Sequence, residues 1–273
     1  MGQSGEPRDE RILSALEGRE LVTVGELADR IGVSEVTIRK DLDSLARRTL
    51  VERVRGGARL RGAEEGPLNL RLGYRSAAKR AVARRAAELV EPNTVIALDS
   101  SSTGYYLALE LASRNDVTVV TNSLRVATQL GEHSELEVVV LGGSIRRTSF
   151  STVGFPPELL RGFGRIGIAF FGVSALSTET GLLERSFSEA ETKRAIASAA
   201  ERVVGLFDSS KAGGFGQHRI VRAEKVSRLI TDEGFSGAEA QPWREIGVPV
   251  DRVPLPETAT GAAGIGAVPT ALR

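Results

Sequence analysis

Near the start of the chain, apolar residues recur at helical spacing in three short stretches separated by polar residues. The apolar faces hold, in order, Ile12, Leu13 and Leu16; Leu27, Ala28 and Ile31; and Ile38, Leu42 and Leu45. Thr23 and Ser34 are suitable N-caps for the second and third stretches, and Gly32-Val33 provides a short turn between them. The pattern predicts three helices in a helix-turn-helix arrangement.

The residues after the third helix predict a β-hairpin. In residues 51–61, VERVRGGARLR, apolar and charged side chains alternate before Gly56-Gly57. Two glycines between extended runs favour a tight turn, because both positions adopt positive φ without strain. A helix-turn-helix followed by a basic hairpin indicates a winged module.

From residue 76 onward, helical stretches alternate with short apolar runs that have the length of strands. The predicted strands are TVIAL (94–98), VTVVT (117–121), LEVVVLGG (136–143), IGIAFFGVS (166–174), RVVGLFD (202–208) and VSRLIT (226–231). Apolar strands between helices predict a doubly wound, mostly parallel sheet, so the fold class is α/β. We therefore expect a winged helix-turn-helix at 1–60, a linker at 61–75, a second domain at 76–253 and a disordered tail at 254–273.

Charge changes the interpretation of the third helix. The chain as a whole carries a net charge of +1, but residues 39–61 contain eight Lys and Arg against three acidic residues. A basic helix taken alone is as well explained by a solvated surface; the turn, the cap and the glycine wing together favour binding in a DNA major groove. The residues predicted to contact DNA are Ser34, Glu35, Thr37, Arg39, Lys40, Arg47, Arg53, Arg55, Gly56 and Gly57.

In the second domain, polar residues and glycines follow the predicted strands. Ligands of such sheets bind at the carboxyl ends of the strands. The candidates there are Asp99, Ser100, Ser101, Ser102 and Thr103, then Asn122 and Ser123, then Gly142 and Gly143. Hydroxyls at the start of a helix suit an anion such as phosphate. Capping or tight turning explains each loop equally well alone; their convergence on one edge favours a shared pocket.

Three further charged residues have two interpretations each. Glu189 and Lys193, at i and i+4 on a predicted helix, have the spacing of a surface ion pair. Lys211, after RVVGLFD, has the position of an exposed loop lysine. A cationic lysine near a hydroxyl-lined loop would also bind a phosphorylated ligand.

The run LADRIGVSEVTIRKDLDSLARRTLVERVRGGA resembles the DNA-binding segment of the DeoR family of bacterial transcriptional regulators, whose pattern is close to VSxxTIRRDLxxLxxxGxLxRxHGGA. LDSSSTGYYLA, VVTNS, LGGSIRRTSFSTVG, GLLERSFSEAETKRAI and FDSSKAGG extend the resemblance over roughly residues 8–235. This chain departs from the family's usual residues in four places: Arg55 replaces His, Thr49 replaces Gly, Ser101 replaces Gly, and Ser174-Ala175 replaces an Asp-Gly or Asn-Gly pair.

The resemblance implies that the second domain is an effector domain with the sugar-phosphate isomerase and CoA-transferase fold. It also implies a repressor of carbohydrate-metabolism genes that senses a phosphorylated sugar or related metabolite. The implied ligand residues are Asp99–Thr103, Asn122, Ser123, Glu189, Lys193 and Lys211. The expected partners are double-stranded operator DNA, the sugar phosphate and a second or further copy of the chain, as a homodimer or homotetramer.

Composition narrows the remaining alternatives. The chain has no Cys and two His, His133 and His218, so disulfides, thiolate metal sites and a zinc or triad enzyme are not expected, and no cofactor is predicted. It has no apolar run of about 18 residues, so we expect a cytoplasmic protein without membrane association. An isomerase with Glu189 or Asp99 as general base remains an alternative. A nucleoid protein would leave the second domain without a role.

Overall fold

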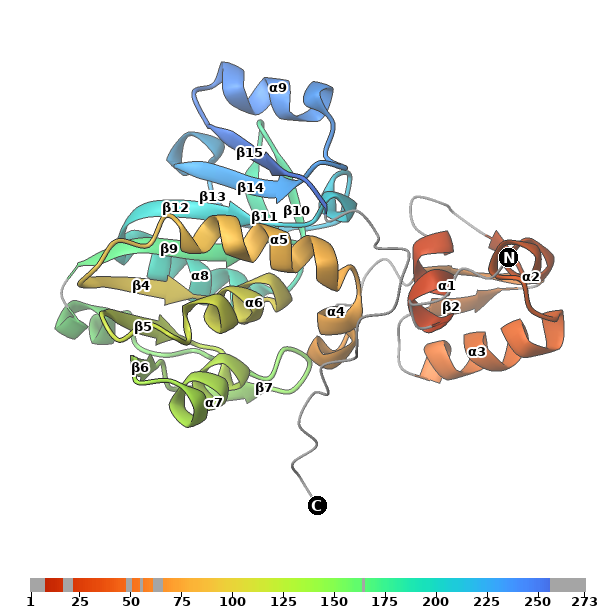
Figure 1. Ribbon diagram of the computed structural model, residues 1–273, viewed down its shortest axis with the longest axis horizontal. Helices are drawn as coiled ribbons and strands as arrows, with labels where there is room; N and C mark the ends of the chain where they lie inside the picture. The colour runs from red at the N-terminus through yellow and green to blue at the C-terminus, as the bar shows by residue number, and fades with distance from the viewer. Residues whose placement is uncertain are drawn as a thin grey trace.

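The computed structural model describes residues 8–16, 22–47, 51–54, 56–60, 66–163 and 165–255. Its elements form an N-terminal part with three helices and a small sheet, and a larger α/β part (Figure 1). Within the described residues, no helix has both the length and the apolar character needed to cross a bilayer.

The N-terminal part confirms the predicted winged helix-turn-helix. Its helices are α1 (Arg8–Leu16), α2 (Val24–Ile31) and α3 (Glu35–Arg47), and its strands are β1 (Val22–Thr23), β2 (Val51–Val54) and β3 (Gly57–Leu60). The strands form an antiparallel sheet in the order β1-β3-β2. The apolar faces predicted from helical spacing meet in one core, which includes Ile12, Leu27 and Ile38 at 0–1% exposure.

Local side-chain bonds fix where these helices begin and end. Thr23 and Glu26 form a capping box at the start of α2, and Gly32 ends that helix in the left-handed conformation with φ of 77°. Ser34 Oγ accepts a hydrogen bond of 3.2 Å from the backbone N–H of Thr37 at the start of α3. The predicted caps and the predicted turn are therefore confirmed.

The hairpin turn differs from the prediction by one residue. Val54 pairs with Gly57 across the hairpin, so Gly57 is the first residue of β3, and of the two glycines only Gly56 lies in the turn. Gly56 has φ of +85°, whereas Gly57 is not among the residues with positive φ. The prediction that both glycines form the turn was wrong, because strand pairing extends to Gly57. Arg55 and Thr49 lie outside the described residues.

The larger part is built on a seven-stranded parallel sheet with the order β15-β14-β12-β9-β4-β5-β6. In chain order its strands are β4 (Thr94–Leu98), β5 (Val117–Thr121), β6 (Glu137–Val140), β9 (Ile166–Gly172), β12 (Ala200–Leu206), β14 (Arg228–Asp232) and β15 (Val250–Val253). The prediction of a doubly wound, parallel α/β sheet is confirmed.

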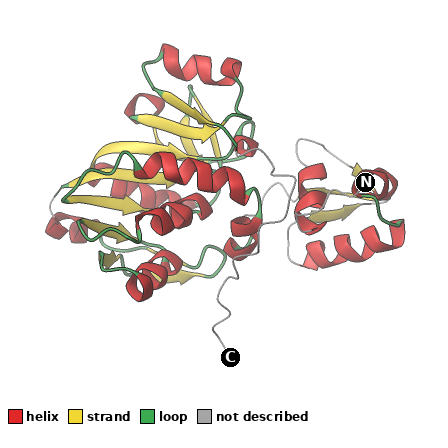
Figure 2. Ribbon diagram, viewed as in Figure 1, coloured by secondary structure: helices red, strands yellow, loops and turns green. Residues whose placement is uncertain are grey.

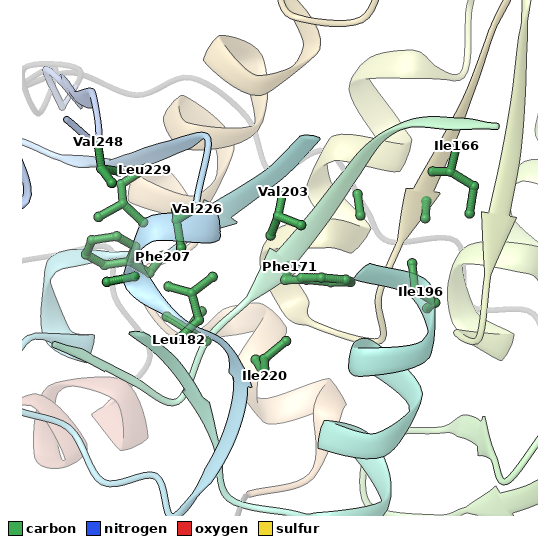
Figure 3. Close-up of a cluster of buried hydrophobic side chains, with 14 of the residues drawn as sticks. Ile166, Phe171, Leu182, Ile196, Val203, Phe207, Ile220, Val226, Leu229 and Val248 are labelled. Atoms are coloured by element: carbon green, nitrogen blue, oxygen red, sulfur yellow. The ribbon is translucent and has the colours of Figure 1, made fainter. Parts of the chain in front are cut away.

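Helices cover both faces of the sheet (Figure 2). One face packs against α5 (Ser76–Ala87), α6 (Ser102–Leu111) and α7 (Leu124–His133). The other packs against α8 (Phe187–Ala199), α9 (Gly237–Glu245) and a small antiparallel sheet of β10 (Ala175–Ser177), β11 (Gly181–Glu184) and β13 (His218–Val221). Figure 3 shows the second core, in which Phe171 of β9 and Ile196 of α8 are fully buried.

Several elements were not predicted from the sequence. Helix α4 (Leu68–Gly73) lies in the stretch interpreted as a linker, and its start is tied to the larger part by a 2.9 Å hydrogen bond from Leu68 N–H to the Thr148 carbonyl. A short hairpin of β7 (Ser144–Arg146) and β8 (Ser151–Val153) and three 3-10 helices, η1 (Pro157–Phe163), η2 (Ser209–Lys211) and η3 (Ala223–Lys225), also occur. Of the predicted tail, residues 256–273 lie outside the described residues.

Candidate functional site

A cavity of about 390 Å³ opens at the carboxyl ends of β4, β9 and β12. This is the edge at which doubly wound sheets bind ligands. The lining includes the start of α6, the ends of β9, β11 and β12, α8, and the η2 loop with the glycines after it, together with residues of α1, α4 and α5. Its polar residues include Ser100, Ser101, Ser102, Thr103, Ser174, Glu184, Glu189, Lys193, Asp208, Ser210 and Lys211.

The start of α6 gives the cavity an end that attracts anions. Ser101 is the N-cap, and its Oγ accepts a hydrogen bond of 2.9 Å from the backbone N–H of Gly104. Ser102 and Thr103 form the first turn, and both line the cavity. Unpaired N–H groups and the helix dipole favour a negative charge at this position.

A buried ion-pair cluster holds this turn in place from below. Lys193 Nζ lies 2.8 Å from Asp99 Oδ2 and 2.6 Å from Glu184 Oε2, and it also donates to the Gly172 carbonyl at 2.8 Å. Asp99 in turn accepts from the backbone N–H groups of Ser101 at 3.1 Å and Gly172 at 2.8 Å. One lysine therefore joins β4, β9, β11 and α8 beneath the cavity.

Gly172 is required at the end of β9 because the chain passes very close to the α6 cap. A Cβ atom on Gly172 would lie 2.2 Å from Cβ and 2.5 Å from Oγ of Ser101. The serine at position 101, where the family usually has glycine, therefore requires the glycine at position 172 opposite it. Ser174 also differs from the family's usual residue. Its Oγ donates to Glu184 Oε1 at 2.5 Å, which adds a hydrogen bond to the buried cluster.

Glu189 is the centre of a second buried network. Its Oε1 accepts hydrogen bonds from Ser149 Oγ at 2.7 Å and Ser151 Oγ at 2.5 Å. Its Oε2 accepts from Ser100 Oγ and from Asn122 Nδ2, both at 3.2 Å. The interpretation of Glu189 and Lys193 as a surface ion pair was wrong. Both are buried, and each has partners from other elements in place of the other.

The opposite side of the cavity carries cations. Lys211, at the end of η2, is partly exposed, and within the described part of the chain its ammonium group makes no hydrogen bond or salt bridge, although its charge helps to lower the pKa of the buried Asp208. Lys79 of α5 is 3% exposed and lies 4.0 Å from Asp208 Oδ2. Lys79 Nζ also donates to the carbonyl of Arg71 at 2.6 Å and to that of Tyr74. Lys211 is therefore available to a ligand, whereas Lys79 is already bonded.

Burial and charge move several pKa values. Burial lowers the pKa of Lys79 to about 7, although the charge of Asp208 partly opposes this. Burial would raise the pKa of Glu184, but Lys193 and three hydrogen bonds outweigh it and bring the value to about 2. Asp99 and Glu184 likewise overcome the effect of burial on Lys193 and raise its pKa. Glu184 and Lys193 are thus both charged at neutral pH, whereas Lys79 titrates there.

The structure brings most of the predicted ligand residues together. Ser100 to Thr103, Glu189, Lys193 and Lys211 line the cavity. Asp99, Asn122 and Ser123 are 0–1% exposed and lie behind it. Ser123 caps α7 by accepting from Val126 N–H at 3.2 Å.

Gly142 and Gly143 are exposed and do not belong to the lining. They connect β6 to β7, where a Cβ on Gly143 would lie 2.2 Å from the Val153 carbonyl oxygen. Gly143 therefore permits a close approach of two backbone segments, whereas a Cβ on Gly142 would meet no atom within 4 Å. Nothing in the geometry connects this turn with a ligand.

Some cavity residues were missed by the sequence reasoning. Asp208 follows β12 just as Asp99 follows β4, so the rule about carboxyl ends of strands would have found it. Ser174 and Glu184 come from the end of β9 and from β11. Lys79 sits in a helix rich in Ala and Arg, where no local signal separates it from surface charges.

The second candidate surface is the outer side of α3. Lys40 and Arg47 are exposed and have no ion-pair partner in the described part of the chain. Arg39 pairs with Glu35 at 2.6 Å. Arg53 of β2 pairs with Asp43 at 2.7 Å and donates to the Arg39 carbonyl at 3.2 Å, so it fastens the wing to α3. This surface offers two free cations beside two acids whose charges are compensated.

Both parts of the chain match models of known domains. Residues 8–62 match the DeoR-like helix-turn-helix domain, and residues 75–233 match the DeoR C terminal sensor domain. The chain belongs to the DeoR family. This DeoR-family protein is therefore a DNA-binding transcriptional regulator, with the winged domain as its DNA-binding part and the α/β domain as its sensor part.

Curated relatives align with this chain over most of their own length. The putative aga operon transcriptional repressor of Escherichia coli O157:H7 is 32% identical over 89% of this chain and 92% of its own. The regulator GolR of Listeria innocua is 33% identical over 89% and 96%, and the glycerol-3-phosphate regulon repressor of Escherichia coli K12 is 28% identical over 81% and 87%. Ribose 5-phosphate isomerase A of Methanocaldococcus jannaschii overlaps 49% of this DeoR-family chain and 53% of its own, at 23% identity and a TM-score of 0.38.

Proposed function

We propose that this regulator is a repressor whose operator affinity falls when a phosphorylated sugar or related metabolite occupies the cavity. The observation that carries the proposal is the pairing, in one cavity, of the α6 N-terminus with Lys211, whose ammonium makes no hydrogen bond or salt bridge with the residues that the structure describes. Both features favour a dianionic phosphate, and the hydroxyls of Ser100 and Ser102 suit the polar remainder of a sugar. The name of the relative that represses a glycerol-3-phosphate regulon supports the same class of ligand.

The cavity is also placed to affect the DNA-binding domain. Gly66, Leu70, Arg71 and Tyr74, in the segment that leads from the winged domain, belong to its lining. Lys79 binds the end of α4 through two backbone carbonyls. A ligand here therefore contacts the connecting segment directly. We propose that this contact favours an arrangement of the winged domains that fits the operator poorly.

Arg75 joins the connecting segment to the η2 side of the cavity. Its Nη2 donates to Ser209 Oγ at 2.7 Å and lies 3.1 Å from Asp232 Oδ1, and its Nε lies 3.2 Å from Asp208 Oδ1. Arg75 itself adopts a left-handed conformation with φ of 48° between α4 and α5. This corner is the part of the chain through which a ligand would act on the segment leading to the winged domain.

We further propose that the protein acts without catalysis. The two carboxylates considered as general bases are both engaged: Glu189 accepts four side-chain hydrogen bonds, and Asp99 is paired with Lys193. A general base needs a lone pair directed at substrate, and these arrangements use the oxygens for holding loops together. Turnover of an aldose or ketose phosphate by the purified protein would contradict this part of the proposal.

The test is a titration of the purified protein against labelled DNA from upstream of its own gene, with and without a panel of sugar phosphates. We expect nanomolar binding that one compound releases. Lys211→Met should bind the DNA equally well but respond to that compound at least tenfold more weakly, because the variant lacks the free cation. Lys225→Met, a lysine change at an exposed position of η3, is the matched control and should respond like the unaltered protein.

The result that would overturn the proposal is DNA binding that no phosphorylated compound alters, or an unchanged response of Lys211→Met. We also propose that the protein binds its operator as a homodimer or homotetramer in the cytoplasm, since two-fold operators match two-fold proteins. Sedimentation of the protein with and without operator DNA measures this directly. A monomer under both conditions would refute it.

A further inference from the structure

One apolar residue on α3 has no structural role in the winged domain. Val36 is 59% exposed. Among the residues the structure describes, it is the one large hydrophobic side chain of this domain that remains exposed; the others of that kind belong to the α/β part. A partner that packs on Val36 removes its apolar surface from water and so gains affinity.

Helical geometry places Val36 at the outermost part of α3. At about 100° per residue, Val36 lies opposite Ile38, Leu42 and Leu45, which are 0% exposed. It shares an arc of about 60° with Lys40, Asp43 and Arg47. Val36 is the second residue of α3 and therefore stands at the N-terminal end of this stripe. In helix-turn-helix proteins the N-terminal residues of this helix contact base edges.

The charges around Val36 allow it to approach DNA closely. Glu35 is paired with Arg39 at 2.6 Å, and Asp43 is paired with Arg53 at 2.7 Å. These pairs compensate the two acids nearest the stripe, so neither carboxylate repels the phosphates on its own. The chemistry presented outward is therefore one apolar group followed, one turn later, by the ammonium of Lys40, which has no ion-pair partner among the described residues.

We propose that Val36 reads sequence by packing against the 5-methyl group of a thymine in the major groove. Thymine is the base that presents a methyl group there, and apolar side chains recognise it by contact. Lys40 lies about 6 Å further along α3, close to two base steps, and its ammonium suits the acceptors of guanine. The inference rests on the DNA-binding function and adds the base class that each position selects.

The test replaces each thymine of the footprinted operator, one at a time, by deoxyuridine, which lacks only the methyl group. The full-length protein should lose about fourfold in affinity at one thymine of each half-site, the effect of one methyl-sized apolar contact. Val36→Ala should bind the original operator more weakly and show no further loss at that thymine. Val36→Thr retains one methyl group and should keep part of the sensitivity.

The matched control is Val140→Ala, which truncates a valine that is 43% exposed on β6. It should leave both the affinity and the deoxyuridine pattern unchanged. Equal binding to every deoxyuridine operator, or a sensitivity that Val36→Ala preserves in full, would overturn the inference while DNA binding itself stands. Absence of DNA binding by the unaltered protein would instead overturn the proposed function, and the inference with it.

Discussion

Replacing Lys193 with methionine tests whether the buried cluster beneath the cavity holds the effector domain together. Methionine is similar in length but has no charge, so the substitution leaves Asp99 and Glu184 without their cation. Those carboxylates are 0% and 5% exposed, so each keeps a buried charge without its cation. The hydrogen bond from Lys193 to the Gly172 carbonyl is lost as well.

The expected loss follows from these contacts. Removing one partner of a buried ion pair typically costs about 3–5 kcal/mol, because a buried charge is left uncompensated. Domains of this kind have a total stability of about 5–15 kcal/mol, so the variant should fold but unfold at a clearly lower urea concentration. Arg194→Met removes the neighbouring charge on the surface of α8 and should cost about 1 kcal/mol or less.

Urea unfolding followed by the fluorescence of Trp243 measures the loss. Trp243 is the single tryptophan of the chain and is buried in the effector domain, so the signal reports that domain. In the unaltered protein the pKa of Glu184 is about 2, below its unfolded value, so its contribution is complete above about pH 4.3 and is lost only as the pH falls further.

The variant should show the opposite dependence on pH. Without the lysine, the effect of burial on Glu184 is no longer outweighed, so the pKa of that carboxyl group rises above its unfolded value and the folded variant binds more protons. Its stability should therefore increase as the pH falls from 7.5 to 5, and the difference from the unaltered protein should narrow. A difference below about 1 kcal/mol at pH 7.5, or one that widens at pH 5, would refute the reasoning.

Three further predictions address other parts of the molecule. Burial holds the pKa of Lys79 at about 7, and a bound anion would raise that pKa. Effector binding should therefore take up protons and be tighter at pH 6 than at pH 8. Calorimetry in buffers of different ionisation enthalpy measures the proton uptake, and its absence would contradict the prediction. Gly172→Ala should destabilise the effector domain by about 1–3 kcal/mol, because the added methyl group clashes with Ser101. Combining it with Ser101→Gly should recover part of that loss in urea unfolding. If the losses of the two single variants simply add in the double variant, the clash is refuted. Thr23→Ala removes the capping box of α2 and should cost about 1 kcal/mol; faster amide exchange confined to the winged domain is the expected readout, and unchanged exchange would count against it.

Much of the fold was predictable because its causes are local. The spacing of Ile38, Leu42 and Leu45 gave α3 its buried face, and Thr23 and Ser34 gave α2 and α3 their caps. Short apolar runs between helices gave the parallel sheet. The rule that ligands bind at the carboxyl ends of parallel strands then placed Ser100–Thr103 at the cavity, where they lie.

The errors occurred where a residue's partner is distant in the sequence. Glu189 and Lys193 have the spacing of a surface pair, yet the sheet order brings Ser149 and Ser151 to one and Asp99 to the other. Gly142 and Gly143 follow a strand like the ligand loops do, but their strand is at the edge of the sheet.

By itself, the sequence determined the three helices of the winged domain, six of the seven strands of the parallel sheet, and the resemblance of the chain to a family of DNA-binding regulators. Hydrophobic periodicity and helix capping depend on neighbours within a few residues, so the sequence alone is enough to predict them. Only the tertiary structure decided which charges are buried together, that Lys211 lines the cavity, and that Val36 is left exposed. Burial and charge pairing depend on distances in space, and those are set by how the strands order themselves and how the helices pack.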